Sequence, residues 1–96
     1  MRVEFSASAQ RDVEKHTAYL IERSSSSAAR FVAELDGAFA HLLAHPPTGH
    51  RVALKQRKSH VRRWNIGDMG IFYDVRGEVL YVIRIRHSAR RPITRT

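Results

Sequence analysis

The sequence predicts an α+β fold in the order β-α-α-β-β-β, with room for a fourth strand after the helices, in which an N-terminal helical hairpin packs on one face of an antiparallel sheet. Apolar residues recur every three or four positions between residues 9 and 43, which is the period of an amphipathic helix. From residue 61 onward they alternate with polar residues, as in strands, and short turn sequences separate the runs. The length of 96 residues predicts a single domain over residues 1–96.

The first half of the chain is expected to form one strand and two helices. The stretch "RVEF" at residues 2–5 alternates like a strand, and the serines after it are suitable helix N-caps. The apolar stripe of the first helix consists of Ala9, Val13, His16, Thr17, Leu20 and Ile21. Asp12 is expected near the start of this helix, where the helix dipole favours negative charge.

The second helix follows the stretch "RSSSS", whose hydroxyl side chains supply turns and caps. Its apolar stripe consists of Ala28, Phe31, Val32, Leu35, Phe39, Leu42 and Leu43. Pro46 and Pro47 mark its end. Because only a few residues join the two helices, we expect an antiparallel hairpin.

The second half of the chain is expected to form the rest of the sheet. The strands are "VRRWNI", "IFYDV" and "VLYVIRIRH", joined by the turns "GDMG" and "RGE", and residues 51–54 form a short strand or an irregular segment. The aromatic residues of these strands are expected mainly in the core. In the last strand, strict alternation predicts one apolar face, formed by Tyr81, Ile83 and Ile85.

The charge of the chain lies almost wholly in its second half. The net charge is +8; residues 1–48 carry −1 and residues 49–96 carry +9, with arginine well ahead of lysine in the second half. The planar guanidinium group suits carboxylate and phosphate recognition. The asymmetry therefore indicates an anionic partner, either nucleic acid or an acidic protein segment, and solubility alone is the simpler alternative.

Several classes of site are disfavoured by the composition. There is no cysteine, which excludes disulfides and thiolate chemistry. His41 and His45 lie one helical turn apart, but no third ligand is near in sequence, so we expect neither a metal nor another cofactor. No apolar run is long enough to cross a membrane and no signal peptide is evident, so we expect a cytoplasmic protein that does not act at a membrane.

The candidate binding residues are basic and lie on the last strands. Arg84 and Arg86 are two positions apart and should point the same way, and Arg62 on another strand is expected to join them. The alternative is a solvated face on which these arginines pair with Asp74 or Glu78.

The segments around these strands are also basic. His87, Arg90 and Arg91 follow the last strand, where a histidine and arginines are suited either to phosphodiester chemistry or to binding. Residues 55–63, "KQRKSHVRR", which include Arg63, resemble a nucleic-acid patch and equally a basic loop leading into a strand.

The order of these parts resembles the RelE/ParE superfamily of bacterial type II toxins. The stretch "VEFSASAQRDVEKHTAYL" is similar to the opening strand and helix of that family, and "AARFVAELDGAFAHLLAHPPTGHR" is similar to its second helix and the turn that follows. The stretches "VRRWNIGDMGIFYDV" and "VLYVIRIRHSARRP" resemble the strand pair and the ParE-type ending. The resemblance covers nearly the whole chain.

This resemblance implies a toxin that inhibits growth, contributes to plasmid stabilisation and is neutralised by a cognate acidic antitoxin in a hetero-oligomer. Two targets are implied. ParE-type toxins poison DNA gyrase without hydrolytic chemistry, whereas RelE-type toxins cleave mRNA on the ribosome. If the chain is an mRNA endonuclease, the resemblance implies catalytic roles for Arg62, Arg84, Arg86 and His87.

The C-terminal sequence favours a gyrase-directed toxin over an mRNA nuclease. No tyrosine follows the last strand, where the family's nucleases typically carry a tyrosine or a histidine, and the "H-x-x-R-R-P" ending is similar to ParE. The residues expected to bind the target or the antitoxin are Arg62, Arg63, Arg84, Arg86, His87, Arg90 and Arg91. A plain nucleic-acid-binding module is the third possibility.

Overall fold

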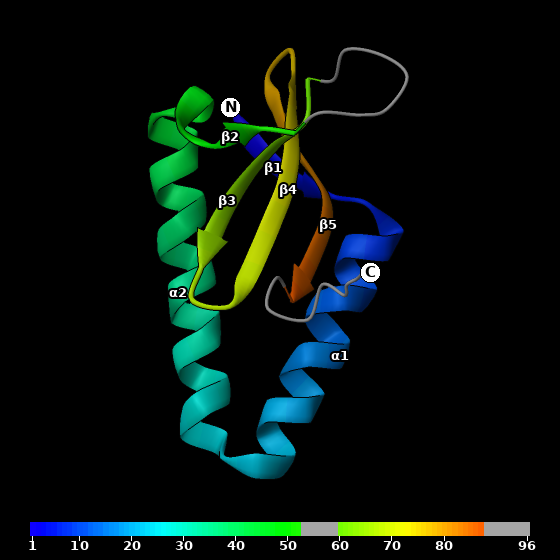
Figure 1. Ribbon diagram of the computed structural model, residues 1–96, viewed down its shortest axis with the longest axis vertical. Helices are drawn as coiled ribbons and strands as arrows, with labels where there is room; N and C mark the ends of the chain where they lie inside the picture. Colours follow the sequence, from blue (N-terminus) through cyan, green and yellow to red (C-terminus); the bar gives the residue numbers. More distant parts are fainter. Residues whose placement is uncertain (53–59, 88–96) are drawn as a thin grey trace, which may run out of the picture.

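The computed structural model describes residues 1–52 and 60–87, and its helices and strands follow the predicted order (Figure 1). The elements are β1 (Arg2–Phe5), α1 (Ala7–Arg23), α2 (Ser25–Ala44), the 3-10 helix η1 (Pro46–Thr48), β2 (His50–Arg51), β3 (Arg62–Ile66), β4 (Met69–Arg76) and β5 (Val79–His87). The predicted α+β class, with two helices before the main part of the sheet, is confirmed.

The sheet has five strands in the order β1-β5-β4-β3-β2. Strands β2 to β5 form the expected antiparallel meander, but β1 pairs with β5 in parallel, so the sheet is mixed and the prediction of an all-antiparallel sheet is wrong at this edge. The reason is the connection. A helical crossover separates β1 from the meander, and such a connection does not impose the antiparallel direction that a short hairpin turn imposes.

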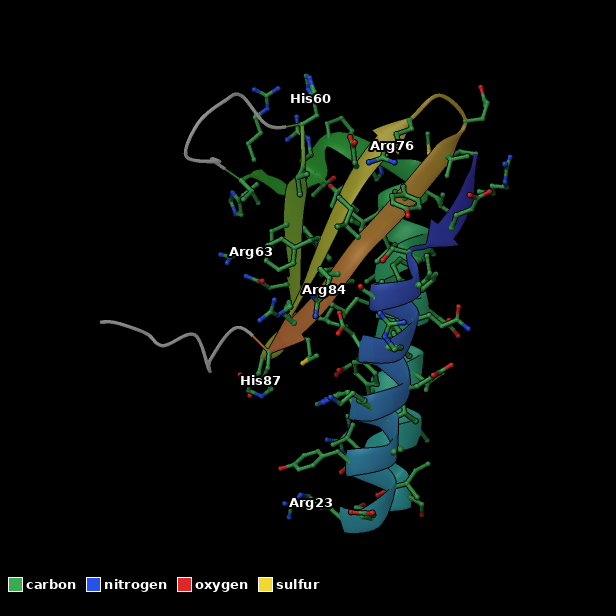
Figure 2. All side chains as sticks on the ribbon, turned by 90° about the vertical axis from the view of Figure 1, so that its right-hand side faces the viewer. Arg23, His60, Arg63, Arg76, Arg84 and His87 are labelled. Carbon is green, nitrogen blue, oxygen red and sulfur yellow. The ribbon has the colours of Figure 1, made fainter. Side chains whose placement is uncertain are left out.

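Serine side chains begin both helices and permit a tight hairpin. The hydroxyl of Ser6 accepts the Ala9 N–H at 2.9 Å at the start of α1. Ser24 ends α1, because its N–H donates to the Leu20 carbonyl at 2.7 Å, and begins α2, because its hydroxyl accepts the Ser27 N–H at 3.3 Å. The two helices cover one face of the sheet and extend together beyond its end (Figures 1 and 2).

The core lies between the helices and the covered face of the sheet. Its buried members from the helices are Ala9, Phe31, Leu35, Ala38 and Leu42, and those from the strands are Met69, Ile71, Tyr73, Leu80, Val82 and Ile85. The predicted helical stripes are confirmed except at their margins, where Ile21 and Val32 remain 57% and 44% exposed. A helix packed in a two-layer fold buries a narrower arc than its apolar stripe covers.

A bulge interrupts the alternation of β5. Tyr73 is opposite Val82, whereas the neighbouring Phe72 is opposite Arg84, so Ile83 is the extra residue. As a result the buried residues of β5 are Leu80, Val82 and Ile85. The prediction of a continuous apolar face through Tyr81, Ile83 and Ile85 is therefore wrong, because one inserted residue shifts the alternation by one position.

Candidate functional site

The face of the sheet that the helices leave uncovered carries the basic residues of the strands. In the register of the sheet, Arg63, Phe72 and Arg84 form one row across β3, β4 and β5. Asn65, Gly70 and Arg86 form the next row. We call this surface the open face and define it by Arg63, Asn65, Phe72, Arg84 and Arg86. Figure 2 shows Arg63 projecting from β3 away from the helices.

Arg63 and Arg86 are the two arginines of the open face that have no ion-pair partner among the described residues. Within residues 1–52 and 60–87, neither side chain forms an ion pair or a hydrogen bond. The stem of Arg63 lies over Gly70, because a Cβ placed on that glycine would be 3.3 Å from the Arg63 Cδ. The missing side chain at Gly70 therefore leaves room for the arginine to lie along the sheet, next to Arg86.

Arg84 is on the open face but is neutralised from within the chain. Its Nε donates to Oδ2 of Asp12 at 2.8 Å and its NH2 group donates to Oδ1 at 3.0 Å. The Ile85 N–H also donates to Oδ2, at 2.9 Å. Burial raises the pKa of Asp12, but the hydrogen bonds from Arg84 and Ile85 and the charges of Arg84 and Arg86 outweigh it, so that the pKa is lowered overall.

This ion pair corrects the expectation that Arg84 is a free cation, and it also differs from the alternative pairing. Asp74 pairs with Arg76 at 3.1 Å, and Glu78 lies 3.7 Å from the N-terminal amine. Arg84 therefore has a helical partner 72 positions away in sequence, which no pattern within the strands indicates. The Arg84 side chain keeps 41% of its surface exposed, so a second anion has access to it.

Arg62 does not join Arg84 and Arg86, and that expectation is wrong. Strand β4 separates β3 from β5, and Arg62 is opposite the buried Tyr73, on the covered side of the sheet. Its guanidinium donates to the carbonyls of Gly49 and Pro47, at 2.8 and 3.2 Å. Arg62 thus holds the connection between α2 and β2, and Arg63 takes the place predicted for it on the open face.

Tyr73 holds the same connection from the core. Its hydroxyl donates to the Pro46 carbonyl at 2.7 Å and accepts the Gly49 N–H at 2.9 Å. Burial raises the pKa of this phenol, and the Gly49 N–H and the charge of Arg62 offset part of that rise. A Cβ on Gly49 would lie 2.6 Å from the Tyr73 oxygen, so only glycine fits there without movement.

His87 lies at the end of β5 and faces His16, which was expected only as a member of an apolar helical stripe. The ring centroids of His16 and His87 are 6.3 Å apart. His16 also packs on Phe31, at 4.7 Å between centroids, and on Tyr19, at 6.1 Å. The pKa of His16 is lowered by burial and by the charge of His87. The position of His16 in the apolar stripe of the first helix indicated that its ring is partly buried, but the stripe does not show that His87 is its neighbour.

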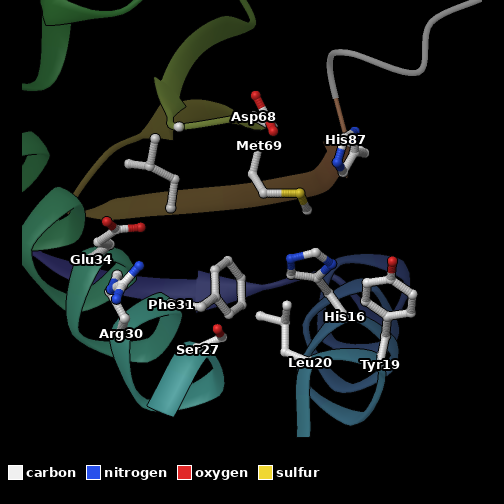
Figure 3. A pocket seen from close by; sticks show the side chains of 12 residues that line it. His16, Tyr19, Leu20, Ser27, Arg30, Phe31, Glu34, Asp68, Met69 and His87 are labelled. Atoms are coloured by element: carbon white, nitrogen blue, oxygen red, sulfur yellow. The ribbon is translucent and has the colours of Figure 1, made fainter. Parts of the chain in front are cut away.

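A pocket of about 350 Å³ lies where the helical hairpin extends past the sheet (Figure 3). Its lining includes His16, Phe31, Met69 and His87 together with the charged residues Arg30, Glu34 and Asp68. Polar and charged side chains make up more of its wall than apolar ones, so the pocket differs from the mainly apolar pockets of typical small-molecule sites. This pocket and the open face meet at the end of β5.

Some of the predicted basic residues cannot be placed. Residues 55–59 of the basic run, with Arg90 and Arg91, are outside the described residues.

The two histidines at metal-like spacing take part in aromatic contacts. His41 stacks on Trp64, 5.0 Å between centroids, and lies 5.3 Å from His45. In the described part of the chain, three potential metal ligands do not gather at one point, and no helix is long and apolar enough to cross a membrane.

Comparison with known proteins identifies the family. Residues 3–92 match the family model of the ParE toxin of the type II toxin-antitoxin system parDE. No curated protein matches the sequence. Among solved structures, the chain is similar to the chromosomal ParDE toxin-antitoxin system from P. aeruginosa, with a TM-score of 0.70 and 16% identity, covering 91% of this chain and 95% of that one.

A second similar structure is the toxin-antitoxin complex RelBE2 from Mycobacterium tuberculosis, with a TM-score of 0.61 and 21% identity over 90% of this chain and 95% of that one. These structural likenesses show a shared fold, and the family model shows membership because it spans nearly the whole sequence. The chain therefore belongs to the family of ParE toxins of type II toxin-antitoxin systems.

Proposed function

We propose that this toxin inhibits DNA gyrase and is neutralised by an acidic antitoxin that docks on its basic side. The membership of the ParE toxin family favours gyrase as the target. The observation that carries the proposal is the open face, on which Arg63 of β3 and Arg86 of β5 flank Gly70 of β4 with no carboxylate bound to either in the described residues. Unpaired like charges on one surface favour an anionic partner.

The geometry favours a binding toxin over a nuclease. Of the four residues suggested for catalysis, Arg62 is bound to backbone carbonyls and Arg84 to Asp12. The Nδ1 atom of His87 is buried and has no hydrogen-bond partner among the described residues. A general acid or base needs an open path to the substrate and a partner that orients its ring, and this arrangement offers neither at Nδ1.

The second candidate function is ribosome-dependent cleavage of mRNA. The observation in its favour is the position of His87 directly after Arg86, beside the pocket at the end of β5. An arginine and a histidine at one strand end supply the two groups that phosphodiester cleavage requires, a cation for the phosphate and an acid or base.

Two parallel reactions distinguish the candidates. In one, the purified toxin is incubated with gyrase, ATP and supercoiled plasmid; in the other, with ribosomes that carry a defined mRNA. The proposal expects gyrase-dependent linear plasmid and intact mRNA. Cleaved mRNA without linear plasmid would establish the second candidate instead.

A His87→Ala variant sharpens the comparison. The gyrase proposal expects linear plasmid at close to the wild-type level, because no proton transfer is needed. A nuclease that depends on His87 would lose roughly two to four orders of magnitude in cleavage rate. His45→Ala, at an exposed position outside the basic run 55–63, is the matched control.

A further inference from the structure

The two histidines at the end of β5 form a pair whose surroundings are set by three elements. His16 belongs to α1 and His87 to β5, and their rings lie 6.3 Å apart at an angle of 62°. Phe31 of α2 closes one side of His16, and Figure 3 shows the His16 ring between Phe31 and Tyr19. The pair is thus fixed by packing between the helices and the strand end.

The pair lacks hydrogen-bond partners within the described chain. No hydrogen bond joins either imidazole to another of the residues in 1–52 and 60–87, and the Nδ1 of His87 is buried. No carboxylate of the described residues is therefore bound to either imidazole.

The charges around the pair differ between its two sides. A pocket of about 400 Å³ on the side of α1 has Lys15 and Arg86 in its wall together with both histidines. The one carboxylate of that wall, Asp12, is already bound to Arg84 and to the Ile85 N–H. On the side of α2 the charged groups are Arg30, Glu34 and Asp68. The α1 side is therefore cationic and gains a further positive charge with each imidazole that is protonated.

We propose that this pocket, lined by Lys15, His16, Arg86 and His87, receives a carboxylate side chain of the antitoxin, and that His16 takes up a proton when it does. This inference rests on the proposed function, since it names the chemistry by which the antitoxin docks. The partner is assigned by charge complementarity: a pocket with two fixed cations and two imidazoles fits an acidic segment. Tyr19, whose side chain is 46% exposed, offers an apolar surface beside the carboxylate.

The direction of the proton uptake follows from electrostatics. In the free toxin, burial and the neighbouring His87 lower the pKa of His16, so that its neutral form is favoured. A carboxylate bound in the pocket against His16 favours the charged imidazole and raises the pKa of His16. The complex therefore holds more protons than its separated parts, and its affinity rises as the pH falls through the range between the free and bound values.

The test is calorimetric titration of the toxin with the antitoxin encoded beside it, in two buffers that differ in ionisation enthalpy. The difference in heat gives the number of protons taken up. We expect uptake of up to one proton and a Kd that decreases by about tenfold between about pH 8 and pH 6. His16→Gln should abolish most of the uptake and flatten the pH dependence, whereas His41→Gln, at an exposed position near the other end of α2, should leave both unchanged.

Each outcome has a distinct meaning. If the antitoxin binds tightly without proton uptake, or if His16→Gln retains the full uptake, the inference is overturned while the proposed function stands. If the antitoxin does not bind at all, the proposed function itself fails. Should His16→Gln fold poorly, NMR titration of the histidines in the wild-type toxin decides the matter, because His16 must titrate at higher pH in the complex than in the free toxin.

Discussion

Asp12 in α1 and Arg84 in β5 form a two-point ion pair, with N–O distances of 2.8 and 3.0 Å, and the same carboxylate accepts the Ile85 N–H. Strand β1 pairs with β5 only as far as Val82, so the edge of β5 beyond that point has no neighbouring strand. The Ser6 hydroxyl donates to the Ile83 carbonyl at 2.6 Å, and Asp12 takes the next N–H. The N-cap Ser6 and Asp12, in the second turn of α1, thus bind backbone groups of β5 where no neighbouring strand does.

Asp12→Asn should destabilise the fold. The neutral amide loses the charge-assisted bonds to Arg84 and weakens the bond to Ile85, which we expect to lower the free energy of unfolding by about 1–2 kcal/mol. The value is kept low because the Arg84 side chain is 41% exposed and solvent screens part of the attraction. Urea unfolding measures it. The control is Asp36→Asn, an exposed aspartate of α2, and an equal loss in both variants would contradict the assignment.

The same pair predicts an acid limit to stability. Because the pKa of Asp12 in the folded toxin is lower than the usual 3.8, ionisation of this carboxyl stabilises the fold. That contribution is fully present above the unfolded value and is lost as the pH falls through the folded one. The difference in unfolding free energy between wild type and Asp12→Asn should be constant at neutral pH and shrink below about pH 4. If this difference in unfolding free energy instead increased as the pH fell, the lowered pKa of Asp12 in the folded toxin would be contradicted.

Tyr73→Phe should weaken the connection between α2 and β2. The substitution keeps the buried ring but removes the hydroxyl that binds the Pro46 carbonyl and the Gly49 N–H, and it leaves that N–H without its partner. We expect a loss of about 2–3 kcal/mol in thermal or urea unfolding. Tyr81→Phe is the matched control, since the Tyr81 side chain contacts Arg76 through its ring. Similar losses in the two variants would argue against a special role for the Tyr73 hydroxyl.

Alanine at two glycines should have opposite effects. At Gly49 a Cβ would lie 2.6 Å from the Tyr73 hydroxyl and 2.9 Å from the Arg63 carbonyl, so we expect Gly49→Ala to cost about 1–3 kcal/mol. At Gly37, within α2, nothing lies within 4 Å of the added Cβ. Gly37→Ala should therefore stabilise the helix by about 0.5–1 kcal/mol. Unfolding midpoints that shift in the same direction for both variants would contradict this contrast.

Local sequence patterns were sufficient to predict the helices and strands, whereas interactions between distant segments determine which residues form the candidate site. The spacing of apolar residues gave both helices and the meander, because burial imposes those periods directly. The alternation around the half-buried Trp64 places Arg62 on the core side and Arg63 on the open side, so the pattern alone favours Arg63 over Arg62 as the open-face residue of this strand.

Other features had no local signal. The bulge at Ile83 shifts the second half of β5 by one residue, and bulges depend on the partner strand. The contacts of Asp12 with Arg84 and of His16 with His87 join α1 to the last strand. A single sequence gives the faces of each element but not the register in which two elements meet, so these partners were found only in the structure.

The central proposal is that the open face, through Arg63 and Arg86, serves both partners of the toxin, so that these two arginines are needed to inhibit gyrase as well as to bind the antitoxin. The measurement is the amount of linear plasmid that gyrase produces with the wild-type toxin, with Arg63→Glu/Arg86→Glu, and with Arg2→Glu/Arg11→Glu, a matched charge reversal at exposed positions of β1 and α1. We predict gyrase-dependent linear plasmid for the wild type, a loss of at least about tenfold for the open-face variant and little change for the control. Wild-type toxin that yields no linear plasmid, or an open-face variant as active as the control, would contradict the account.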